Sequence, residues 1–290
     1  MDGWIILDKP SDIFSRTASS RVAKMFATKK VGHIGTLDPM ASGVLPIAIG
    51  NATKMIPFIE NISDDKKEYT FSMQFGFETD TLDISGKTIK TIENIPNNID
   101  TIKDTLHSFI GEKLQIPPIF SAIHVNGVRA YKIAREGKEL DIPERKINIF
   151  ELDFLEKVDK SYHFRVLCSR GTYVRSIARD IAYKLGTFGT VDMIRRLHTT
   201  GFDIKNTVKL DFLENLFNNG GDINNFLMPL DFGLGDIPVL NLDDKSAKLY
   251  KNGGFIETNV PNGMFRIYSA EQFIGIGIVN NKVLCPKRTI

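Results

Sequence analysis

The sequence has few residues of the kinds that form disulfides, bind metals or span membranes. Its 290 residues include two cysteines, five histidines and one tryptophan. Cys168 and Cys285 lie far apart and no basic segment precedes an apolar stretch at the N-terminus, so we expect free thiols and no secretory signal. The cysteines and histidines show no zinc-type spacing. No apolar run reaches the roughly 18 residues that a membrane span needs. We therefore expect a cytoplasmic protein without membrane segments or bound metal.

Charge is nearly balanced over the chain but unevenly distributed. The formal net charge is +2, which argues against a general polyanion binder. Residues 60–112 carry eleven acidic and five basic side chains, whereas residues 165–198 carry seven basic and two acidic ones. A basic stretch inside a near-neutral chain is typical of a phosphate-contacting face, and equally of a solvated helix face.

Hydrophobic periodicity predicts interspersed strands and helices. Strands are expected where apolar residues alternate or form short runs, at 5–7, 44–49, 66–77, 145–158 and 162–168. Helices are expected where apolar residues recur at helical spacing, at 15–26, 99–110 and 172–185. Ser15 is expected to cap the first helix, and Gly111 and Gly186 to close the other two. Asn126-Gly127 marks a tight turn. Because short turns as well as helices join the strands, these elements predict an α+β fold with a mixed, largely antiparallel sheet.

The pattern of apolar residues changes near Asp236. Residues 201–235 are less regular, and short apolar segments separated by turns follow, at 239–242, 265–268 and 273–278. We expect residues 1–235 to form one large domain and residues 236–290 a small β-rich C-terminal domain.

The segment from Gly32 to Val44 is the most informative part of the chain. It holds three glycines (Gly32, Gly35 and Gly43), Pro39, and a single carboxylate, Asp38. Glycine permits backbone conformations that a side chain would block, so the loop is shaped to place that carboxylate. Asp38 could cap a helix, ligate a metal or act as a nucleophile, and the spacing alone leaves these roles open. The loop supplies no further acids for a metal.

Three other segments combine residues suited to binding a nucleic-acid base. Tyr69 opens the alternating strand, residues 79–86 form a polar turn, and Tyr173 lies two residues before Arg175. An aromatic ring can stack on a flipped base, and a guanidinium can hold a carboxylate or a phosphate. Each of these side chains could instead be a packing or surface residue.

Several ordered motifs resemble those of the TruB family of tRNA pseudouridine synthases. Gly32–Gly50 resembles the catalytic-aspartate motif of that family and Asp8-Lys9-Pro10 its N-terminal motif. Further matches follow in order: Tyr69 with residues 79–86, residues 116–137, 168–175 and 227–231. The resemblance covers nearly the whole chain, and the C-terminal segment resembles a short PUA domain, which binds RNA.

The resemblance implies a role for each site residue. Asp38 would be the nucleophile in cleavage of the C1′–N1 bond of one uridine, and Arg175 would pair with it and keep it ionised. Tyr69 would stack on the flipped uracil, and Tyr173 and Ile194 would line the pocket. His33 would contact the displaced RNA loop. Lys9 and Pro10 would support the active-site loop.

The chain departs from the family pattern at three of these places. Asp12 stands where the family usually has Gly, so the turn after Lys9-Pro10 can differ in conformation. Ile194 replaces the usual Leu, a nearly isosteric change. His124 stands where many members have Lys, which puts one phosphate contact in question.

The resulting hypothesis is a cofactor-free, metal-free, monomeric enzyme that isomerises uridine 55 in the T-stem-loop of tRNA. A non-catalytic tRNA-binding or tRNA-folding protein of the same fold is the alternative, and the intact set of Asp38, Tyr69, Tyr173 and Arg175 argues against it. An enzyme of ribosomal RNA would be expected to carry basic extensions. A phosphatase with an aspartate nucleophile would need clustered metal-binding acids.

Overall fold

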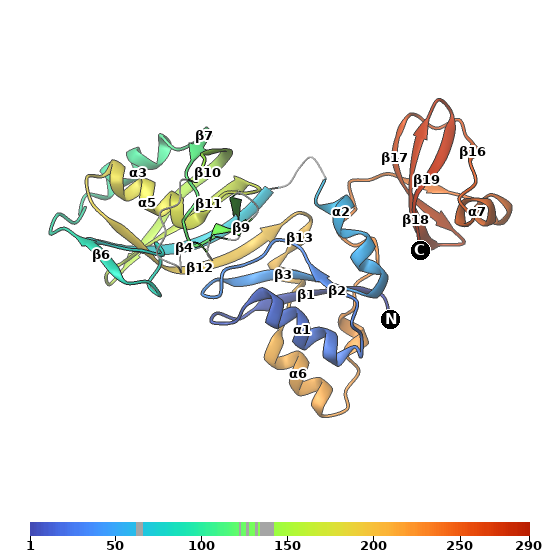
Figure 1. Cartoon of the computed structure of the whole chain (residues 1–290), viewed down its shortest axis with the longest axis horizontal. Helices are drawn as coiled ribbons and strands as arrows, with labels where there is room; N and C mark the ends of the chain where they lie inside the picture. Colours follow the sequence, from blue (N-terminus) through green and yellow to red (C-terminus); the bar gives the residue numbers. More distant parts are fainter. Residues whose placement is uncertain (62–65, 122, 126–127, 131–132, 134–141) are drawn as a thin grey trace. The chain divides into compact units, whose positions relative to one another are not determined.

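The computed structural model describes residues 1–61, 66–121, 123–125, 128–130, 133 and 142–290. The chain divides into two compact units (Figure 1). The first consists of residues 1–37, 44–63 and 200–290, and the second of residues 38–43 and 64–199.

An antiparallel sheet forms the frame of the second unit. Its strands follow the order β12 (Gly189–Thr199), β4 (Lys66–Phe75), β11 (Ser161–Ser169), β10 (Arg145–Val158) and β7 (Gly111–Gln115). Beside β12, Arg195 and Arg196 pair in parallel with Ser42 and Gly43, the first residues of β3 (Ser42–Ile49). The sheet is therefore mixed but mostly antiparallel, as the sequence predicts.

Two helices pack on this sheet and cover its core. These are α5 (Val174–Lys184), against β12 and β4, and α3 (Ile99–His107), against β10 (Figure 1). In α5 the buried residues Ile177, Ala178, Ile181 and Ala182 recur at helical spacing, which gives the helix one apolar face. Two short hairpins complete the unit: β5 (Phe77–Thr79) with β6 (Thr88–Thr91), and β8 (His124–Val125) with β9 (Val128–Arg129).

The first unit contains the N-terminal strands and the helices around them. Strand β1 (Gly3–Lys9) lies between β14 (Val208–Lys209), with which it is parallel, and β3, which also pairs with β2 (Val31–His33). The other elements before residue 236 are α1 (Ser15–Met25), η1 (Gly50–Lys54), α2 (Ile56–Ile59), β13 (Phe202–Asp203), η2 (Ile204–Asn206), α6 (Leu210–Asn218) and η3 (Ile223–Phe226). Trp4 is fully buried in this core, and its indole N–H donates to the Leu230 carbonyl at 2.9 Å.

The C-terminal part of the same unit is a small sheet with one helix. The strand order is β15 (Val239–Asn241), β17 (Gly263–Ser269), β18 (Gln272–Asn280), β19 (Val283–Thr289) and β16 (Ile256–Glu257), and α7 (Asp244–Lys251) packs on it. Tyr250, Ile267 and Leu284 are fully buried in its core. Its β-rich character confirms the predicted fold class. The boundary at residue 236 stays a prediction, because the compact unit joins this segment to the N-terminal elements.

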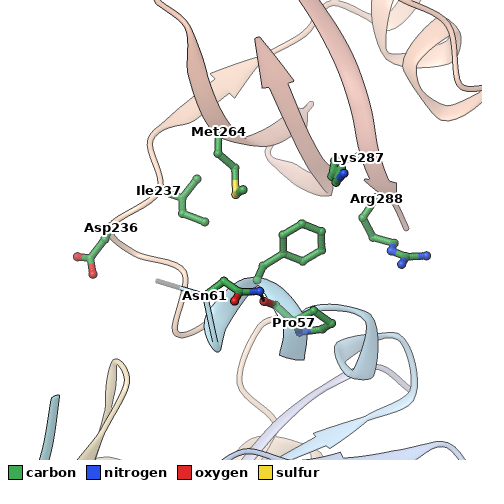
Figure 2. A pocket seen from close by; sticks show the side chains of 8 residues that line it. Pro57, Asn61, Asp236, Ile237, Met264, Lys287 and Arg288 are labelled. Atoms are coloured by element: carbon green, nitrogen blue, oxygen red, sulfur yellow. Dashed lines mark hydrogen bonds between the residues drawn. The ribbon is translucent and has the colours of Figure 1, made fainter. Parts of the chain in front are cut away.

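A cavity of about 470 Å³ lies between α2 and this small sheet (Figure 2). Phe58 and Met264 form its apolar walls, and Lys287 and Arg288 lie at one side. None of the candidate site residues lines it.

Several predicted elements differ from the structure at their ends. The strand expected at 66–77 breaks at Gly76, whose φ of +102° ends β4 before β5 begins. The helix expected at 99–110 ends at His107, so Gly111 opens β7 and does not close the helix. Gly186, with φ of +72°, does follow the end of α5.

The expected cap of the first helix is wrong. Phe14 occupies the N-cap position of α1 and makes no side-chain cap. The buried Ser15 hydroxyl instead bonds Leu37: it donates to the Leu37 carbonyl and accepts from the Leu37 N–H, both at 2.9 Å. The hydroxyl therefore stabilises the loop before Asp38 and not the helix end.

Strands β7 and β12 and helices α6 and α7 are absent from the sequence-based prediction. In β12 two β-bulges, one between Val191 and Met193 and one between Arg196 and His198, interrupt the period-two alternation that identifies a strand. Within the described part of the chain, no helix is long and apolar enough to cross a bilayer. Both cysteines are free thiols.

Candidate active site

The loop that carries Asp38 is held by hydrogen bonds on both sides of the carboxylate. Ser15 fixes Leu37, and the Asp38 carbonyl accepts the Ala41 N–H at 3.1 Å. The loop then runs into Gly43, whose φ is +101°. A Cβ at Gly43 would lie 2.2 Å from the Arg196 carbonyl oxygen, so only glycine fits there. The Asp38 side chain remains 37% exposed.

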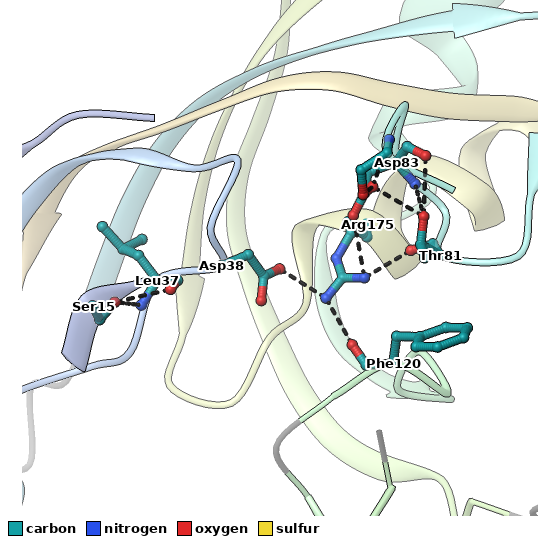
Figure 3. A network of polar contacts seen from close by, with 8 residues as sticks. Ser15, Leu37, Asp38, Thr81, Asp83, Phe120 and Arg175 are labelled. Carbon is teal, nitrogen blue, oxygen red and sulfur yellow. Dashed lines mark hydrogen bonds and ion pairs between the residues drawn. The ribbon is translucent and has the colours of Figure 1, made fainter. Parts of the chain in front are cut away.

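Arg175, the second residue of α5, forms an ion pair with this carboxylate. Its Nη2 lies 2.8 Å from Asp38 Oδ2, and its own side chain is only 4% exposed (Figure 3). The same guanidinium donates to the carbonyls of Thr81 at 2.7 Å and Phe120 at 3.0 Å. The cation is thus fixed from several directions, while the carboxylate stays open to solvent on one side.

A second carboxylate, Asp83, lies beside the other terminal nitrogen of the Arg175 guanidinium. Its Oδ2 lies 3.4 Å from Arg175 Nη1 and its side chain is 6% exposed. Asp83 Oδ1 accepts two hydrogen bonds: one from Thr81 Oγ1 at 2.9 Å and one from the Ser85 N–H at 3.0 Å (Figure 3). The sequence predicts a polar turn here but does not identify Asp83 as a partner of Arg175. The high proportion of Thr, Asp and Ser at 79–85 could have identified it, since these side chains bond to backbone and to one another in turns.

Tyr69 lies on the buried face of β4, directly opposite Val166 of β11 and Arg196 of β12. It is 7% exposed. Burial raises the pKa of the Tyr69 phenol to about 12, and the Asp38 charge adds to the rise, while the Arg196 guanidinium opposes it. The phenol therefore lies within electrostatic reach of the Asp38 carboxylate. Arg196 was not among the site residues predicted from the sequence, because nothing local in the chain distinguishes it from Arg195.

Tyr173 is the N-cap residue of α5, and its backbone is clamped by a buried side chain. Gln115 accepts the Tyr173 N–H at 2.8 Å and donates to the Tyr173 carbonyl at 3.1 Å. The Arg145 guanidinium lies 5.6 Å from the ring centroid. Burial raises the pKa of the Tyr173 phenol, the Arg145 charge lowers it, and the Asp38 charge raises it.

Ile194 is the last of the expected residues on the second unit. It lies on β12 opposite Phe71, is 4% exposed, and its carbonyl accepts from Ser42 Oγ at 3.4 Å. The structure therefore brings Asp38, Tyr69, Tyr173, Arg175 and Ile194 into one unit, from the loop, β4, β12 and the start of α5.

The remaining expected residues belong to the first unit. His33 ends β2, with Nδ1 3.0 Å from Ser19 Oγ and Nε2 3.3 Å from Thr36 Oγ1. Lys9 is fully buried, and its Nζ donates to the carbonyls of Pro10 and Ile13, both at 2.8 Å. These bonds close the turn after the N-terminal motif.

Part of the family-like segment at 116–137 lies outside the described residues. The Asn126-Gly127 turn is among the undescribed positions, although β8 and β9 flank it. His124 begins β8, and its side chain is outside the description, so the departure there stays open.

The basic stretch at 165–198 is largely engaged within the protein. Arg165 forms ion pairs with three carboxylates, those of Glu68, Glu151 and Asp153. Arg179 pairs with the carboxylate of its neighbour, and Arg175 and Arg196 are buried. These four arginines are therefore buried or paired within the protein, and contact of the basic stretch with phosphate stays a prediction.

The chemistry of this arrangement is that of a positioned carboxylate beside two phenols. Asp38 is partly exposed and is fixed by Arg175, and its charge acts on both phenols, whose rings are of a kind that can stack on a base. In the described part of the chain, no group of three or more His, Cys, Asp or Glu side chains is placed to hold a metal ion.

Comparison with known proteins agrees with this geometry. Residues 23–174 match the family model described as TruB family pseudouridylate synthase (N terminal domain), and residues 238–290 match pseudouridine synthase II TruB, C-terminal. A protein of Ehrlichia chaffeensis named tRNA pseudouridine synthase B is 44% identical over 99% of this chain and 99% of its own length. A protein of the same name from Caulobacter vibrioides is 44% identical over 85% of this chain and 78% of its own.

Solved structures show the same fold at lower identity. A chain of a Cbf5-Nop10-Gar1 complex superposes with a TM-score of 0.72 at 21% identity, covering 99% of this chain and 84% of its own. A chain of an H/ACA RNP bound to a substrate RNA gives a TM-score of 0.72 at 19% identity, with the same coverage. With family models over both ends and relatives at 44% identity over most of its length, the chain belongs to the TruB family of pseudouridylate synthases.

Proposed function

We propose that this enzyme isomerises uridine to pseudouridine at position 55 in the T-loop of tRNA. The relatives named above carry the name tRNA pseudouridine synthase B, which supports tRNA as the substrate. The observation that carries the proposal is the 2.8 Å ion pair between a half-exposed Asp38 and a buried Arg175. A carboxylate fixed on one side and open on the other is suited to attack a substrate placed over it.

In the proposed reaction the target uridine is flipped out of the RNA and enters the site beside Asp38. Asp38 assists cleavage of the C1′–N1 bond, the uracil turns, and C5 joins C1′ while C5 loses its proton and N1 gains one. Substrate and product have the same composition, so no group carrier is required. Flipping costs a few kcal/mol, which contacts to the flipped base must offset.

Each remaining residue of the site has a proposed role that its position supports. Tyr69 is proposed to stack on the flipped uracil and Tyr173 to line the pocket, and the Asp38 charge raises the pKa of both phenols. Ile194 lies opposite Phe71, two residues before the strand partner of Tyr69, and is proposed to contribute an apolar wall. His33, in the first unit, is proposed to contact the displaced RNA loop.

The proposal is tested by replacing Asp38 with Asn. Asp38→Asn removes the charge at constant size, so we expect tritium release from C5-labelled uridine in a tRNA transcript to disappear while RNA binding is retained. Asp159→Asn is the matched control: Asp159 lies in the turn between β10 and β11 with φ of +52°, which Asn also tolerates. Substantial turnover by Asp38→Asn, with the control fully active, would contradict the role of Asp38.

The target position is tested separately from the chemistry. A transcript with cytidine in place of uridine 55 should release no tritium, and pseudouridine mapping of total tRNA should show position 55 modified only in cells that express the protein. Release from the substituted transcript would contradict position 55 without affecting the role of Asp38. A cytoplasmic monomer is proposed as well, for which light scattering of the purified enzyme gives the mass.

A further inference from the structure

Arg196 is a fully buried arginine in the middle of the sheet that carries the site. Its relative exposure is 0%, and it is one of the largest completely buried side chains of the chain. Placing a guanidinium in a protein interior is costly unless it makes specific contacts. The contact that concerns the site is a hydrogen bond to the hydroxyl of Tyr69, its direct cross-strand partner.

The direction of that hydrogen bond is fixed by chemistry. A guanidinium carries five N–H donors and no acceptor. The Tyr69 oxygen must therefore accept from Arg196, so the phenolic O–H does not point at Arg196. The phenolic proton of Tyr69 is then free to be donated to a group other than Arg196.

The backbone of Arg196 is held where this contact requires it. Gly43, from the end of the Asp38 loop, pairs with Arg196 and approaches its backbone so closely that a Cβ would lie 2.8 Å from its nitrogen. A β-bulge follows directly, between Arg196 and His198. Arg196 thus pairs with Tyr69 on one side and with Gly43, at the end of the Asp38 loop, on the other.

We propose that Arg196 is a positioning residue that turns the Tyr69 hydroxyl into a hydrogen-bond donor toward the reacting uracil. The role of the uracil in this inference rests on the proposed function, whereas the contact between Arg196 and Tyr69 does not. Arg196 touches no substrate and acts only through the phenol.

Electrostatics agree with the geometry. Burial raises the pKa of the Tyr69 phenol and Arg196 lowers it, so removal of the guanidinium is expected to raise that pKa further. Burial lowers the pKa of Arg196, and the Tyr69 contact raises it.

The contact is tested without RNA, by placing 3-fluorotyrosine at position 69 alone and titrating it by ¹⁹F NMR. Arg196→Met fills a similar volume without a charge, and we expect it to raise the pKa of the fluorophenol, with Arg196→Lys in between. Arg165→Met is the matched control, since Arg165 pairs with Thr70 on the opposite face of the same sheet. An unchanged titration in folded Arg196→Met or Arg196→Lys would overturn the proposal.

The catalytic consequence is tested by single-turnover tritium release in a double-mutant cycle. Losing a hydrogen bond from a charged donor should slow Arg196→Met by about 10- to 100-fold. In a Tyr69→Phe background the same change should alter the rate by less than about threefold, because the group it acts on is gone. Equal slowing in both backgrounds means a general structural role and overturns the proposal, as does an unslowed Arg196→Met.

The two experiments separate this inference from the proposed function. If the unaltered protein releases no tritium, the proposed function fails while the fluorotyrosine titration still decides the contact. If it releases tritium and the titration does not respond to Arg196, only the positioning role fails.

Discussion

Single residues in unusual backbone conformations shape the loops around the site. Asp12 occupies the position where related proteins usually have Gly, and its φ is +64°. Asp12 is therefore in the left-handed region, which aspartate tolerates better than most residues. Lys9 closes this turn through the two carbonyls described above. Whether the turn differs from that of the family stays a prediction.

Gly43 is the glycine whose replacement should disturb the Asp38 loop directly. Gly43→Ala adds a Cβ in contact with the Arg196 backbone at a φ of +101°, so we expect a loss of about 2–4 kcal/mol in the free energy of unfolding. Urea denaturation measures the loss, and tritium release should fall with it because the Asp38 loop is displaced.

Gly220 provides the control for this substitution. It has a φ of +74°, and no other atom lies within 4 Å of the place that a Cβ would occupy. Gly220→Ala should therefore lower the free energy of unfolding only by the cost of the left-handed backbone, about 1–2 kcal/mol. Equal losses for the two variants would show that the close approach of β12 contributes nothing at Gly43.

At the scale of elements, β12 determines which side chains face the site. Asp192 is the extra residue of its first bulge, and Ile194 and Arg196 follow later in the strand. Asp192 accepts hydrogen bonds from three side chains of neighbouring strands: Ser72, Gln74 and Ser161. The bulge is therefore tied to β4 and β11, and this fixes the register of everything after it.

Removal of the Asp192 carboxylate should loosen this register. We expect Asp192→Ala to lower the free energy of unfolding by about 1–3 kcal/mol, because partly buried donors lose a charged acceptor. Asp153→Ala is the control: Asp153 is 57% exposed and makes a 3.4 Å ion pair with Arg165, so its loss should cost less than about 1 kcal/mol. Urea denaturation of both variants is the measurement, and a smaller effect at Asp192 than at Asp153 would contradict the role of the bulge.

At the scale of the whole molecule, buried acids that stay protonated should make the fold sensitive to alkali. Burial raises the pKa of Tyr69 from 10.0 to about 12 and that of Cys168 from 9.0 to about 12. Their contribution to stability is complete below pH 9 for the thiol and pH 10 for the phenol. It is lost as the pH rises toward 12, because the unfolded chain releases these protons first.

We therefore expect the free energy of unfolding to fall above pH 9, with a slope of up to about 1.4 kcal/mol per pH unit for each group. Urea denaturation between pH 8 and pH 11 measures the slope. Cys168→Ala should flatten it between pH 9 and pH 10, and a stability independent of pH over this range would contradict the prediction.

Local patterns identified much of the framework correctly. The alternation from Tyr69 to Phe75 predicted β4, the helical spacing of Ile177 and Ile181 predicted α5, and both are present. Strand β12 was not predicted, because its bulges break the alternation, and neither was α7, which buries only Ala247 and Tyr250. Patterns of this kind are visible only where each residue faces one consistent environment.

The sequence by itself determined the family, the α+β class and the identity of Asp38 as the candidate carboxylate, because these depend on motifs and periodicities that are local in the chain. The resemblance also predicted the pair of Asp38 with Arg175, whereas only the tertiary structure showed the partners of that pair and of Tyr69, namely Asp83 and Arg196. Arg175, Asp83, Tyr69 and Arg196 lie between 31 and 158 positions from Asp38 in the sequence, and their contacts follow from strand register and helix position. Whether an arginine pairs with a carboxylate, a phenol or solvent depends on burial across several strands, and no local pattern records it.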